Sequence, residues 1–392
     1  MVWAVDWSVF VERQSCDLLK RICALAALLI VAGCGSLPQA VIGAGDFTAA
    51  DVTAKGAKVI DLYLATSRAP DENEKILFSG ERANIISFTR LQVSIPPNHR
   101  PGEIERPIRT IPNPRTEFTI LEPDVLPSSN AFIASLDADL ARRPRNERDV
   151  LVFVHGYNTD LTSAIFRTAQ FANDINYPGI PVLFSWASRG RTLDYIYDLN
   201  SALHARDALL ETGEVLSRTS ADGFNVVAHS MGTLLTVEAM RQAVLASPNR
   251  GPENFRVRNV ALAAPDIDID LFRRQLEVLP TTGIPIYVLV SDDDRALSLS
   301  TFIAGGRQRV GLADLEELTN LGVIVIDLSA VEDRDTTSHT KFANSPEVIR
   351  ILGDGLRAGN TLETRTNEGF RIADLTGAPA TVVQSGRALV FD

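Results

Sequence analysis

The sequence has few cysteines and no cluster of positive charge. Its three cysteines, Cys16, Cys23 and Cys34, lie near the start of 392 residues, so a chain processed near residue 34 has no thiol pair for a disulfide or a zinc site. Lys and Arg number 38 against 49 Asp and Glu, a net charge of −11 without a basic run, which argues against a nucleic-acid partner. The hydrophobic share of 45% is that of a globular chain and excludes a low-complexity protein.

The sequence also lacks an apolar run long enough for a permanent membrane-spanning helix. The run at 22–32 has about half of the ~20 residues that a spanning helix needs. It follows the basic pair Lys20-Arg21 and precedes small residues at 33–36. A basic flank, a short apolar core and small residues at the cleavage point predict a signal peptide over residues 1–33.

The end of this signal resembles the lipobox of bacterial lipoproteins, with the residues Val31-Ala32-Gly33-Cys34. The resemblance implies that Cys34 is diacylated and becomes the mature N-terminus, anchored in a membrane of the cell envelope and facing the periplasm. Gly35 instead of Asp after the cysteine favours the outer membrane. Residues 34–57, rich in Ala, Gly and Thr, are expected to be a tether. The alternative is a simple secretory signal that happens to contain a cysteine.

Beyond residue 57, apolar runs suited to buried strands alternate with helix-length patterns. The expected strands span 59–64, 85–95, 150–154, 182–186, 225–228, 257–263, 284–290 and 323–326. The expected helices span 161–173, 194–218, 231–245, 269–278 and 296–303. This alternation predicts an α/β fold over 58–354, with a mostly parallel twisted sheet and helices on both faces.

Two segments depart from this alternation. Repeated prolines predict an irregular or extended course over 96–127, with an antiparallel edge. Residues 355–392 are expected to be a C-terminal extension of unknown role, in which 381–383 and 388–391 could pair as a hairpin.

Ligands of such sheets bind at the carboxyl ends of the strands, so the residues that follow each strand are the candidates for chemistry. The pentapeptide Ala228-His229-Ser230-Met231-Gly232 lies between an expected strand and an expected helix and has the pattern of a nucleophile elbow, with Ala where Gly is usual. A serine hydroxyl is a poor nucleophile until a base removes its proton. Ser230 is therefore the candidate nucleophile, and it needs a histidine.

The chain has five histidines. His99 lies in the proline-rich stretch and His204 in the middle of an expected helix, so each is assigned a structural or solvated role. His229 precedes the nucleophile and must point away from its hydroxyl, which makes it a pocket or packing residue. His339 lies in a loop after the last main strand and is the predicted base. His155 remains for another part of the site.

The pair His155-Gly156 resembles the oxyanion-hole signature of lipases and esterases, in which the chain turns after a strand and exposes backbone N–H groups. By this resemblance the amides of Tyr157 and Met231 bind the oxygen that becomes negative during acyl transfer. The alternative is that Gly156 only permits a tight loop and that His155 only supports it.

The acid that orients the histidine comes from one of two aspartate groups. Asp292, Asp293 and Asp294 follow the 284–290 strand, and Asp266, Asp268 and Asp270 follow the 257–263 strand. Such groups also cap helices or bind calcium, but neither has a recognisable calcium-loop spacing, so no metal is expected. Asp294 is favoured, and the alternatives are Asp292, Asp293 and Asp266.

Together these motifs resemble the α/β-hydrolase fold, in particular a bacterial branch of the esterase/lipase superfamily of unknown function. The matching stretches, over about residues 58–350, are LYLATSR at 62–68, VSIPPNHRPGEIE at 93–105, VFVHGYN at 152–158, FSWAS at 184–188, AHSMG at 228–232, AAPDID at 263–268 and DRAL at 294–297. The resemblance favours Asp294, the aspartate before Arg-Ala-Leu. It implies hydrolysis of an ester or related acyl bond of a small molecule, without a cofactor.

Other interpretations stay open. A catalytically silent hydrolase-fold lipoprotein would act in binding, and an acyltransferase or a peptidase would use the same triad. Tyr157 and Trp186 could line an acyl pocket, although Trp186 could equally belong to the core. Tyr195, Tyr197 and the helix to Arg218 lie where such folds place a cap over the site.

Overall fold

The structure is a computed structural model that describes residues 41, 43, 46–73, 75–109, 111–246, 256–279, 283–333, 337–357, 381–384 and 387–389. All of them belong to one structural unit, Ala40–Asp392. The predicted signal peptide and the lipidation site Cys34 lie outside the described residues. No helix within the described residues is long and apolar enough to cross a membrane.

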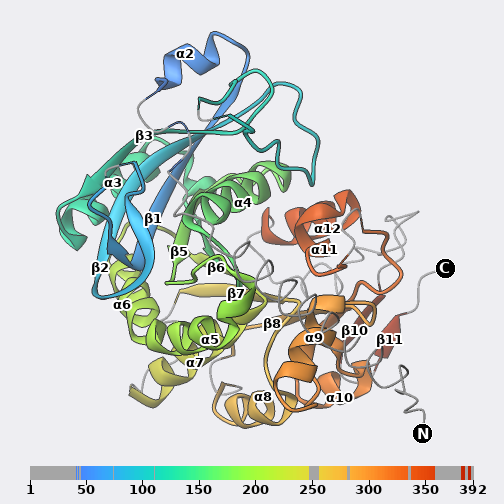
Figure 1. The fold of residues 1–392 in the computed structure, drawn as a ribbon. Helices are drawn as coiled ribbons and strands as arrows, with labels where there is room; N and C mark the ends of the chain where they lie inside the picture. Colours follow the sequence, from blue (N-terminus) through green and yellow to red (C-terminus); the bar gives the residue numbers. More distant parts are fainter. Residues whose placement is uncertain are drawn as a thin grey trace, which may run out of the picture. The chain divides into compact units, whose positions relative to one another are not determined.

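The described strands form one sheet of eleven, whose central pairs are parallel (Figure 1). The strands are β1 (Lys58–Pro70), β2 (Phe78–Ile95), β3 (Thr119–Leu126), β4 (Val150–Val154), β5 (Ile180–Ser185), β6 (Phe224–His229), β7 (Val257–Ala263), β8 (Ile286–Val290), β9 (Ile324–Asp327), β10 (Thr381–Gln384) and β11 (Arg387–Leu389). Their order is β11-β10-β9-β8-β7-β6-β4-β5-β1-β2-β3. In this order, all neighbouring pairs between β9 and β1 are parallel. At the two edges, β2 and β3 on one side and β10 and β11 on the other pair antiparallel. The predicted mostly parallel sheet is confirmed.

The strand order reverses beside β4, and this reversal positions the site. After β4 the chain adds β5 on one side and then β6 on the other. Ligands of doubly wound sheets bind at such a reversal, beyond the carboxyl ends of the strands. Val154 at the end of β4 is paired with Ala228 in β6, so the loops that follow these two strands leave the sheet side by side.

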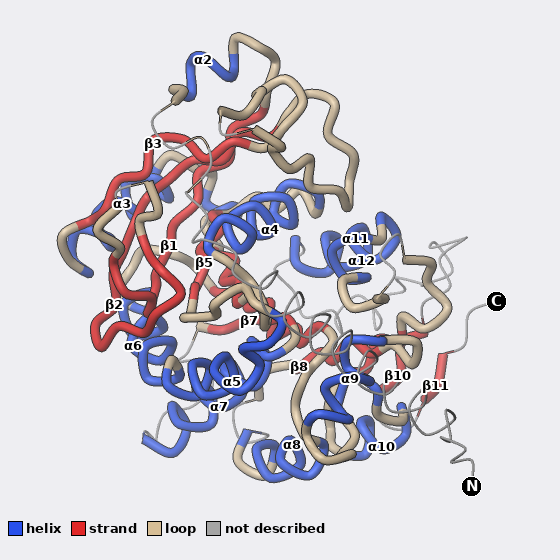
Figure 2. Tube along the Cα trace, viewed as in Figure 1, coloured by secondary structure: helices blue, strands red, loops and turns tan. Residues whose placement is uncertain are grey.

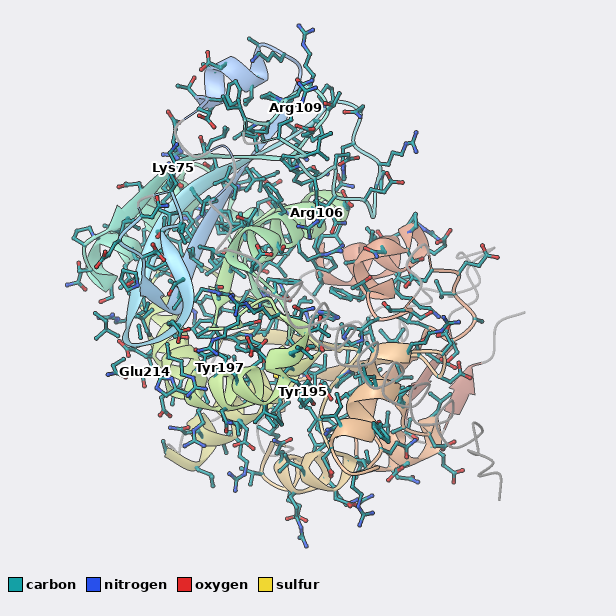
Figure 3. All side chains as sticks on the ribbon, viewed as in Figure 1. Lys75, Arg106, Arg109, Tyr195, Tyr197 and Glu214 are labelled. Carbon is teal, nitrogen blue, oxygen red and sulfur yellow. The ribbon has the colours of Figure 1, made fainter. Side chains whose placement is uncertain are left out.

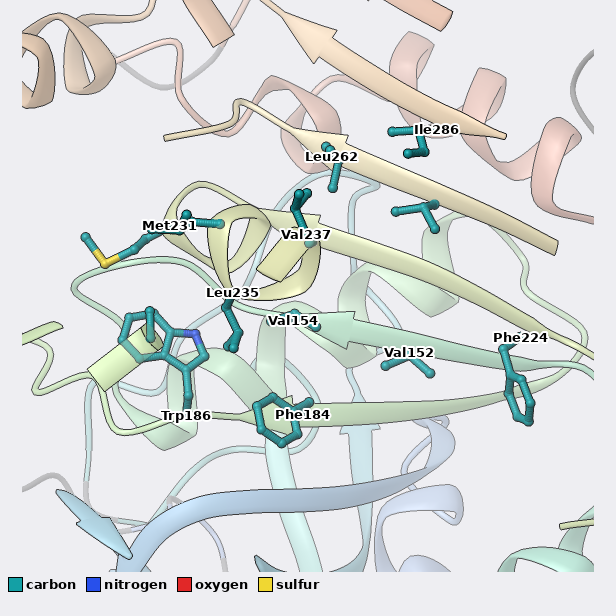
Figure 4. Close-up of a cluster of buried hydrophobic side chains, with 14 of the residues drawn as sticks. Val152, Val154, Phe184, Trp186, Phe224, Met231, Leu235, Val237, Leu262 and Ile286 are labelled. Carbon is teal, nitrogen blue, oxygen red and sulfur yellow. The ribbon is translucent and has the colours of Figure 1, made fainter. Parts of the chain in front are cut away.

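Helices cover both faces of the sheet (Figure 2). They are α2 (Ala49–Thr53), α3 (Ser129–Ala141), α4 (Leu161–Asp174), α5 (Tyr195–His204), α6 (Arg206–Ser217), α7 (Met231–Ala246), α8 (Ile269–Leu276), α9 (Arg295–Ile303), α10 (Leu315–Asn320), α11 (Lys341–Asn344) and α12 (Pro346–Arg357). Val152 and Val154 of β4 face the core on one side of the sheet, which α3, α5, α6, α7 and α8 cover and part of which Figure 4 shows. Leu151 and Phe153 face the core on the other side, which α4, α11 and α12 cover. Burial on both faces explains why β4 is an unbroken apolar run.

One of the expected elements is corrected, and two others are defined by their pairing in the sheet. The helix expected over 194–218 bends at Ala205 into α5 and α6, because the bend lets both pack against α7. The antiparallel edge expected within 96–127 is β3, and Pro123 is tolerated there because β3 is an edge strand. The expected C-terminal hairpin is formed by β10 and β11, and it continues the main sheet because β10 pairs with β9.

The predicted tether is also corrected at its C-terminal end. Residues 49–53 form α2, which begins with a capping box between Thr48 and Asp51. Val52 is fully buried and packs with Leu121 of β3. The folded domain therefore begins before residue 58.

His99, assigned a structural role from the sequence, lies between two carboxylates. Its Nδ1 is 2.8 Å from Oε2 of Glu105, and its Nε2 is 2.7 Å from Oδ1 of Asp174 at the end of α4. Burial opposes protonation of His99, but the hydrogen bonds and charges of Asp174 and Glu105 outweigh it and raise its pKa above the ordinary value. The charged ring ties the 93–105 stretch to α4.

We expect this contact to make stability depend on pH. A histidine with a raised pKa contributes stability that is complete below about pH 6.5 and is lost as pH rises through the pKa of the folded state. Denaturant unfolding should therefore show wild type more stable than His99→Gln by about 1.5–3 kcal/mol at low pH, with the gap closing at alkaline pH. The exposed His204, changed to Gln, is the matched control and should show no such trend. A gap that is constant across pH would contradict the charged contact.

Candidate active site

Ser230 occupies a sharp turn between β6 and α7. Its φ of +54° lies in the left-handed region, which residues other than glycine rarely adopt and which functional turns use. Its N–H donates to the carbonyl of Ala263 at 2.9 Å, and its own carbonyl accepts from the N–H groups of Thr233 and Asp266. The turn is thus held by its neighbours, and Ser230 is only 4% exposed.

Two glycines allow this turn to approach the loop after β4. A Cβ atom on Gly156 would lie 2.8 Å from Cβ of Ser230, and one on Gly232 would lie 2.3 Å from the carbonyl oxygen of His155. Folded proteins do not tolerate Cβ contacts this short, so any side chain at either position would push the two loops apart. The glycines therefore fix the distance between the candidate nucleophile and the candidate oxyanion loop.

The predicted base contacts the favoured acid. Nδ1 of His339 is 2.7 Å from Oδ2 of Asp294, whose side chain is 1% exposed. The other oxygen of Asp294 accepts the N–H of Leu297 at 2.9 Å and so caps α9. Because the cap fixes the carboxylate, the carboxylate can in turn fix the ring of His339.

The three alternative aspartates have other contacts. Asp292 is exposed at the surface. Asp293 binds Nζ of the buried Lys341 at 2.7 Å and accepts the hydroxyl of Ser338 at 2.9 Å. Asp266 accepts the hydroxyl of Tyr195 and lies 3.1 Å from Nε of Arg309. Of the four candidates, Asp294 is the one that contacts His339.

His229 holds the loop that carries His339. Its Nε2 lies 3.0 Å from the carbonyl oxygen of His339, and its ring packs between the rings of His339 and Phe342 at 4.7 and 4.8 Å. Burial, followed by the nearby His339, lowers the pKa of His229 well below its ordinary value, so the ring is neutral and donates through Nε2. The pocket or packing residue expected from the sequence is thus a link between the Ser230 turn and the His339 loop.

The contact between serine and histidine is not formed. Within the described part of the chain, neither the hydroxyl of Ser230 nor Nε2 of His339 makes a hydrogen bond. Catalytic hydrogen bonds of free enzymes are often long and tighten only when substrate binds. The structure thus brings Asp294 and His339 together and positions both beside the Ser230 turn.

The two candidate oxyanion amides have no partner within the described residues. Met231 is the first residue of α7, where N–H groups lack partners inside the helix. The N–H of Tyr157, just beyond β4, likewise donates no hydrogen bond to any residue described. Two unused donors therefore lie on the two adjacent loops that leave β4 and β6.

A family model described as alpha/beta hydrolase of unknown function (DUF900) matches residues 130–355. The chain belongs to this alpha/beta hydrolase family. The match and the sheet topology confirm the predicted α/β-hydrolase fold. No curated protein matches the chain.

Solved structures with similarity to this alpha/beta hydrolase include three proteins. An esterase of Pyrobaculum calidifontis is 11% identical, with a TM-score of 0.35 over 78% of this chain and 88% of that chain. A lipase-esterase related protein from Clostridium acetobutylicum is 12% identical, with a TM-score of 0.28 over 54% and 96%. An esterase of Pyrococcus furiosus is 9% identical, with a TM-score of 0.31 over 84% and 97%.

The aromatic residues near the site of this alpha/beta hydrolase are divided between core and rim. Trp186 is fully buried in the core and stacks on the ring of His155 at 5.0 Å, which is the core role considered for it (Figure 4). Tyr157 is partly exposed and packs edge-on against Tyr195 at 5.2 Å. Tyr195 belongs to α5 (Figure 3), so α5 contacts the loop after β4 through this residue.

Tyr197, also expected in the cap, contacts Arg189 and Gly80 instead of residues of the site. The guanidinium of Arg189 lies 3.6 Å from the centre of its ring, and its hydroxyl donates to the carbonyl of Gly80. This side chain therefore packs on the start of β2 instead of on the site. Among the described residues, no group of three or more His, Cys, Asp or Glu side chains could hold a metal ion.

Sequence reasoning missed Lys341, which supports the histidine loop. Its ammonium is buried and donates to Asp293, to the hydroxyl of Ser291 at 2.9 Å and to the carbonyl of Leu328 at 3.1 Å. The contacts connect the loop after β8 with the loop of His339. The sequence signal was weak, since a lysine two residues after the base is usually a solvated surface residue.

Proposed function

We propose that this protein is a serine hydrolase that cleaves an ester or a related acyl bond through an acyl-enzyme intermediate. Ser230 is the nucleophile, His339 the general base and Asp294 the orienting acid. The observation that carries the proposal is the His339–Asp294 pair, held against the Ser230 turn by His229. A positioned carboxylate and imidazole beside a strained serine turn are the parts that nucleophilic acyl transfer needs.

In the proposed reaction, Oγ of Ser230 attacks the carbonyl carbon while Nε2 of His339 takes its proton. Asp294 accepts Nδ1–H of the ring and stabilises the imidazolium. The amides of Tyr157 and Met231 donate to the oxygen that becomes negative. Return of the proton to the leaving alcohol gives the acyl-enzyme, which water hydrolyses by the same steps. No step needs a cofactor.

The proposal is tested with nitrophenyl esters of graded acyl chain length and with a fluorophosphonate. We expect turnover of at least one ester and covalent labelling of Ser230, located by mass spectrometry of the digested protein. An acyltransferase would instead release more nitrophenol when an alcohol is added as acceptor. A folded protein without turnover and without labelling would overturn the proposal and favour a binding role.

We also propose that the protein is anchored by lipid at Cys34 in the cell envelope. The support is the lipobox pattern in the sequence. One acyl chain binds membranes only marginally, and lipoprotein maturation supplies several chains at one cysteine.

For this anchor we expect Cys34→Ser to move the protein from the membrane pellet to uncleaved precursor or to a soluble periplasmic form. Cys16→Ser and Cys23→Ser are the matched controls and should leave the distribution unchanged, because neither lies at the cleavage point. Fractionation followed by N-terminal mass spectrometry measures both outcomes. Wild type found soluble in the cytoplasm with residues 1–33 intact would overturn the anchor and leave the hydrolase proposal unaffected.

A further inference from the structure

A buried arginine near the end of β1 contacts the loop after β4, which carries the Tyr157 amide, and the loop after β5. Arg68 is 1% exposed. Its Nη2 donates to the carbonyl of Thr159 at 2.8 Å, in the loop after β4, and its Nη1 donates to the carbonyl of Ser188 at 2.8 Å, in the loop after β5. Burial lowers the pKa of Arg68 to about 10, so the guanidinium stays charged at neutral pH. Burying a charge costs free energy unless hydrogen bonds satisfy it, and the backbone carbonyls of these two loops accept hydrogen bonds from the guanidinium.

The same guanidinium reaches His155 through one hydroxyl. Nε of Arg68 donates to Oγ of Ser185 at 2.8 Å, and that oxygen lies 3.1 Å from Nε2 of His155. Nε2 also accepts the N–H of Trp186 at 3.2 Å, so the ring proton is on Nδ1. Burial, followed by the charge of Arg68, lowers the pKa of His155 to about 3, and the ring is neutral.

Nδ1–H of His155 donates to the carbonyl of Gly156 at 2.9 Å. That carbonyl belongs to the peptide group whose N–H is the amide of Tyr157. In a trans peptide the C=O and N–H groups point in opposite directions, so holding the carbonyl fixes the direction of the N–H. The hydrogen-bond series from Arg68 through Ser185 and His155 therefore ends at one of the two proposed oxyanion donors.

We propose that Arg68 is a positioning residue that orients the Tyr157 amide toward the substrate oxygen. The proposal rests on the proposed function, since an oxyanion donor matters only if Ser230 attacks a carbonyl. A second anchor holds the same loop: the carboxylate of Asp198 accepts the N–H of Asn158 at 3.1 Å and the hydroxyl of Ser188 at 2.6 Å. Arg68 and Asp198 thus both hold this loop.

The test compares Arg68→Met with Arg90→Met. Arg90 is a matched control, because it bonds the carboxylates of Asp61 and Asp139 at 3.0 Å and makes no contact with the loop. An oxyanion donor contributes about 10²–10³ in kcat, and a small misplacement of a catalytic group costs about 100-fold. We expect Arg68→Met to lower kcat about 10- to 100-fold with KM nearly unchanged, and Arg90→Met to leave both unchanged.

Two further variants keep the proposal testable if Arg68→Met fails to fold. Ser185→Ala removes only the hydroxyl between Arg68 and His155, and we expect about a tenfold loss of kcat. Arg68→Lys keeps the charge without the planar fork, and its kcat should also fall because one ammonium cannot reach all the acceptors. Wild-type kcat in both variants would overturn the proposal.

Hydrogen exchange gives a readout that does not depend on activity. Peptides that cover 155–160 should exchange faster in Arg68→Met than in wild type or in Arg90→Met, measured by mass spectrometry. Equal exchange in all three proteins would overturn the positioning role. If wild type neither turns over esters nor reacts at Ser230, the proposed function fails, whereas the exchange result still decides whether Arg68 holds the loop.

Discussion

Replacing Ser230 with alanine is expected to lower ester turnover by about a thousandfold or more, because the members of a triad act as a unit. The change removes one hydroxyl oxygen that makes no hydrogen bond within the described part of the chain, so the fold should be unaffected. Steady-state kinetics with the best ester substrate measures the loss. Circular dichroism and thermal unfolding measure the fold.

Covalent labelling tests whether Ser230 itself is the nucleophile. A fluorophosphonate should modify wild type at Ser230 and leave Ser230→Ala unlabelled. Ser217→Ala, at an exposed position of α6, is the matched control and should behave as wild type in both assays. Labelling at another residue, or full activity in Ser230→Ala, would show that the nucleophile lies elsewhere.

Asp294→Asn should cause the second large loss, again on the order of a thousandfold in kcat. The asparagine oxygen can still accept the N–H of Leu297 and cap α9, so the helix should remain. An amide facing Nδ1 of His339 stabilises the wrong tautomer of the ring and cannot stabilise an imidazolium. The variant therefore separates the catalytic role of Asp294 from its structural role.

The other aspartates supply the controls. Asp292→Asn should have little effect, because that side chain is exposed. Asp293→Asn weakens the contact with Lys341 and should reduce activity less than Asp294→Asn, since it acts only through the loop. If Asp266→Asn is the damaging change instead, the acid comes from the loop after β7 and the assignment of Asp294 is wrong.

Much of the fold could be predicted from local pattern. The strand β4 is buried on both faces and so appears as an unbroken apolar run, and the later helices have apolar residues at helical spacing. Alternation of these elements implies a parallel sheet, because parallel strands need a crossover. The Ser230 turn was also predictable, since small residues around a serine between a strand and a helix form a local motif.

Features that depend on distant partners could not be predicted from the sequence. The bounds of β3 depend on its pairing with β2, and the attachment of the C-terminal hairpin to the sheet depends on the pairing of β10 with β9. At Ala205 the chain bends between α5 and α6, and both helices pack against α7. Local propensity contains no information about these partners.

Some residues of the candidate site could be identified from the sequence, and others only from the structure. The sequence by itself determined Ser230 as the candidate nucleophile and His339 as the candidate base, because the chain has few histidines and one strand-to-helix serine turn of this kind. Only the tertiary structure decided which aspartate contacts His339, since the partners are 45 positions apart and adjacent side chains of the 292–294 run point in different directions. It also revealed the contacts of Arg68 with two loops, which form only when folding brings those loops around its guanidinium. A residue's type and spacing limit the chemistry that it can do, but its partners are set by packing between segments that the sequence keeps far apart.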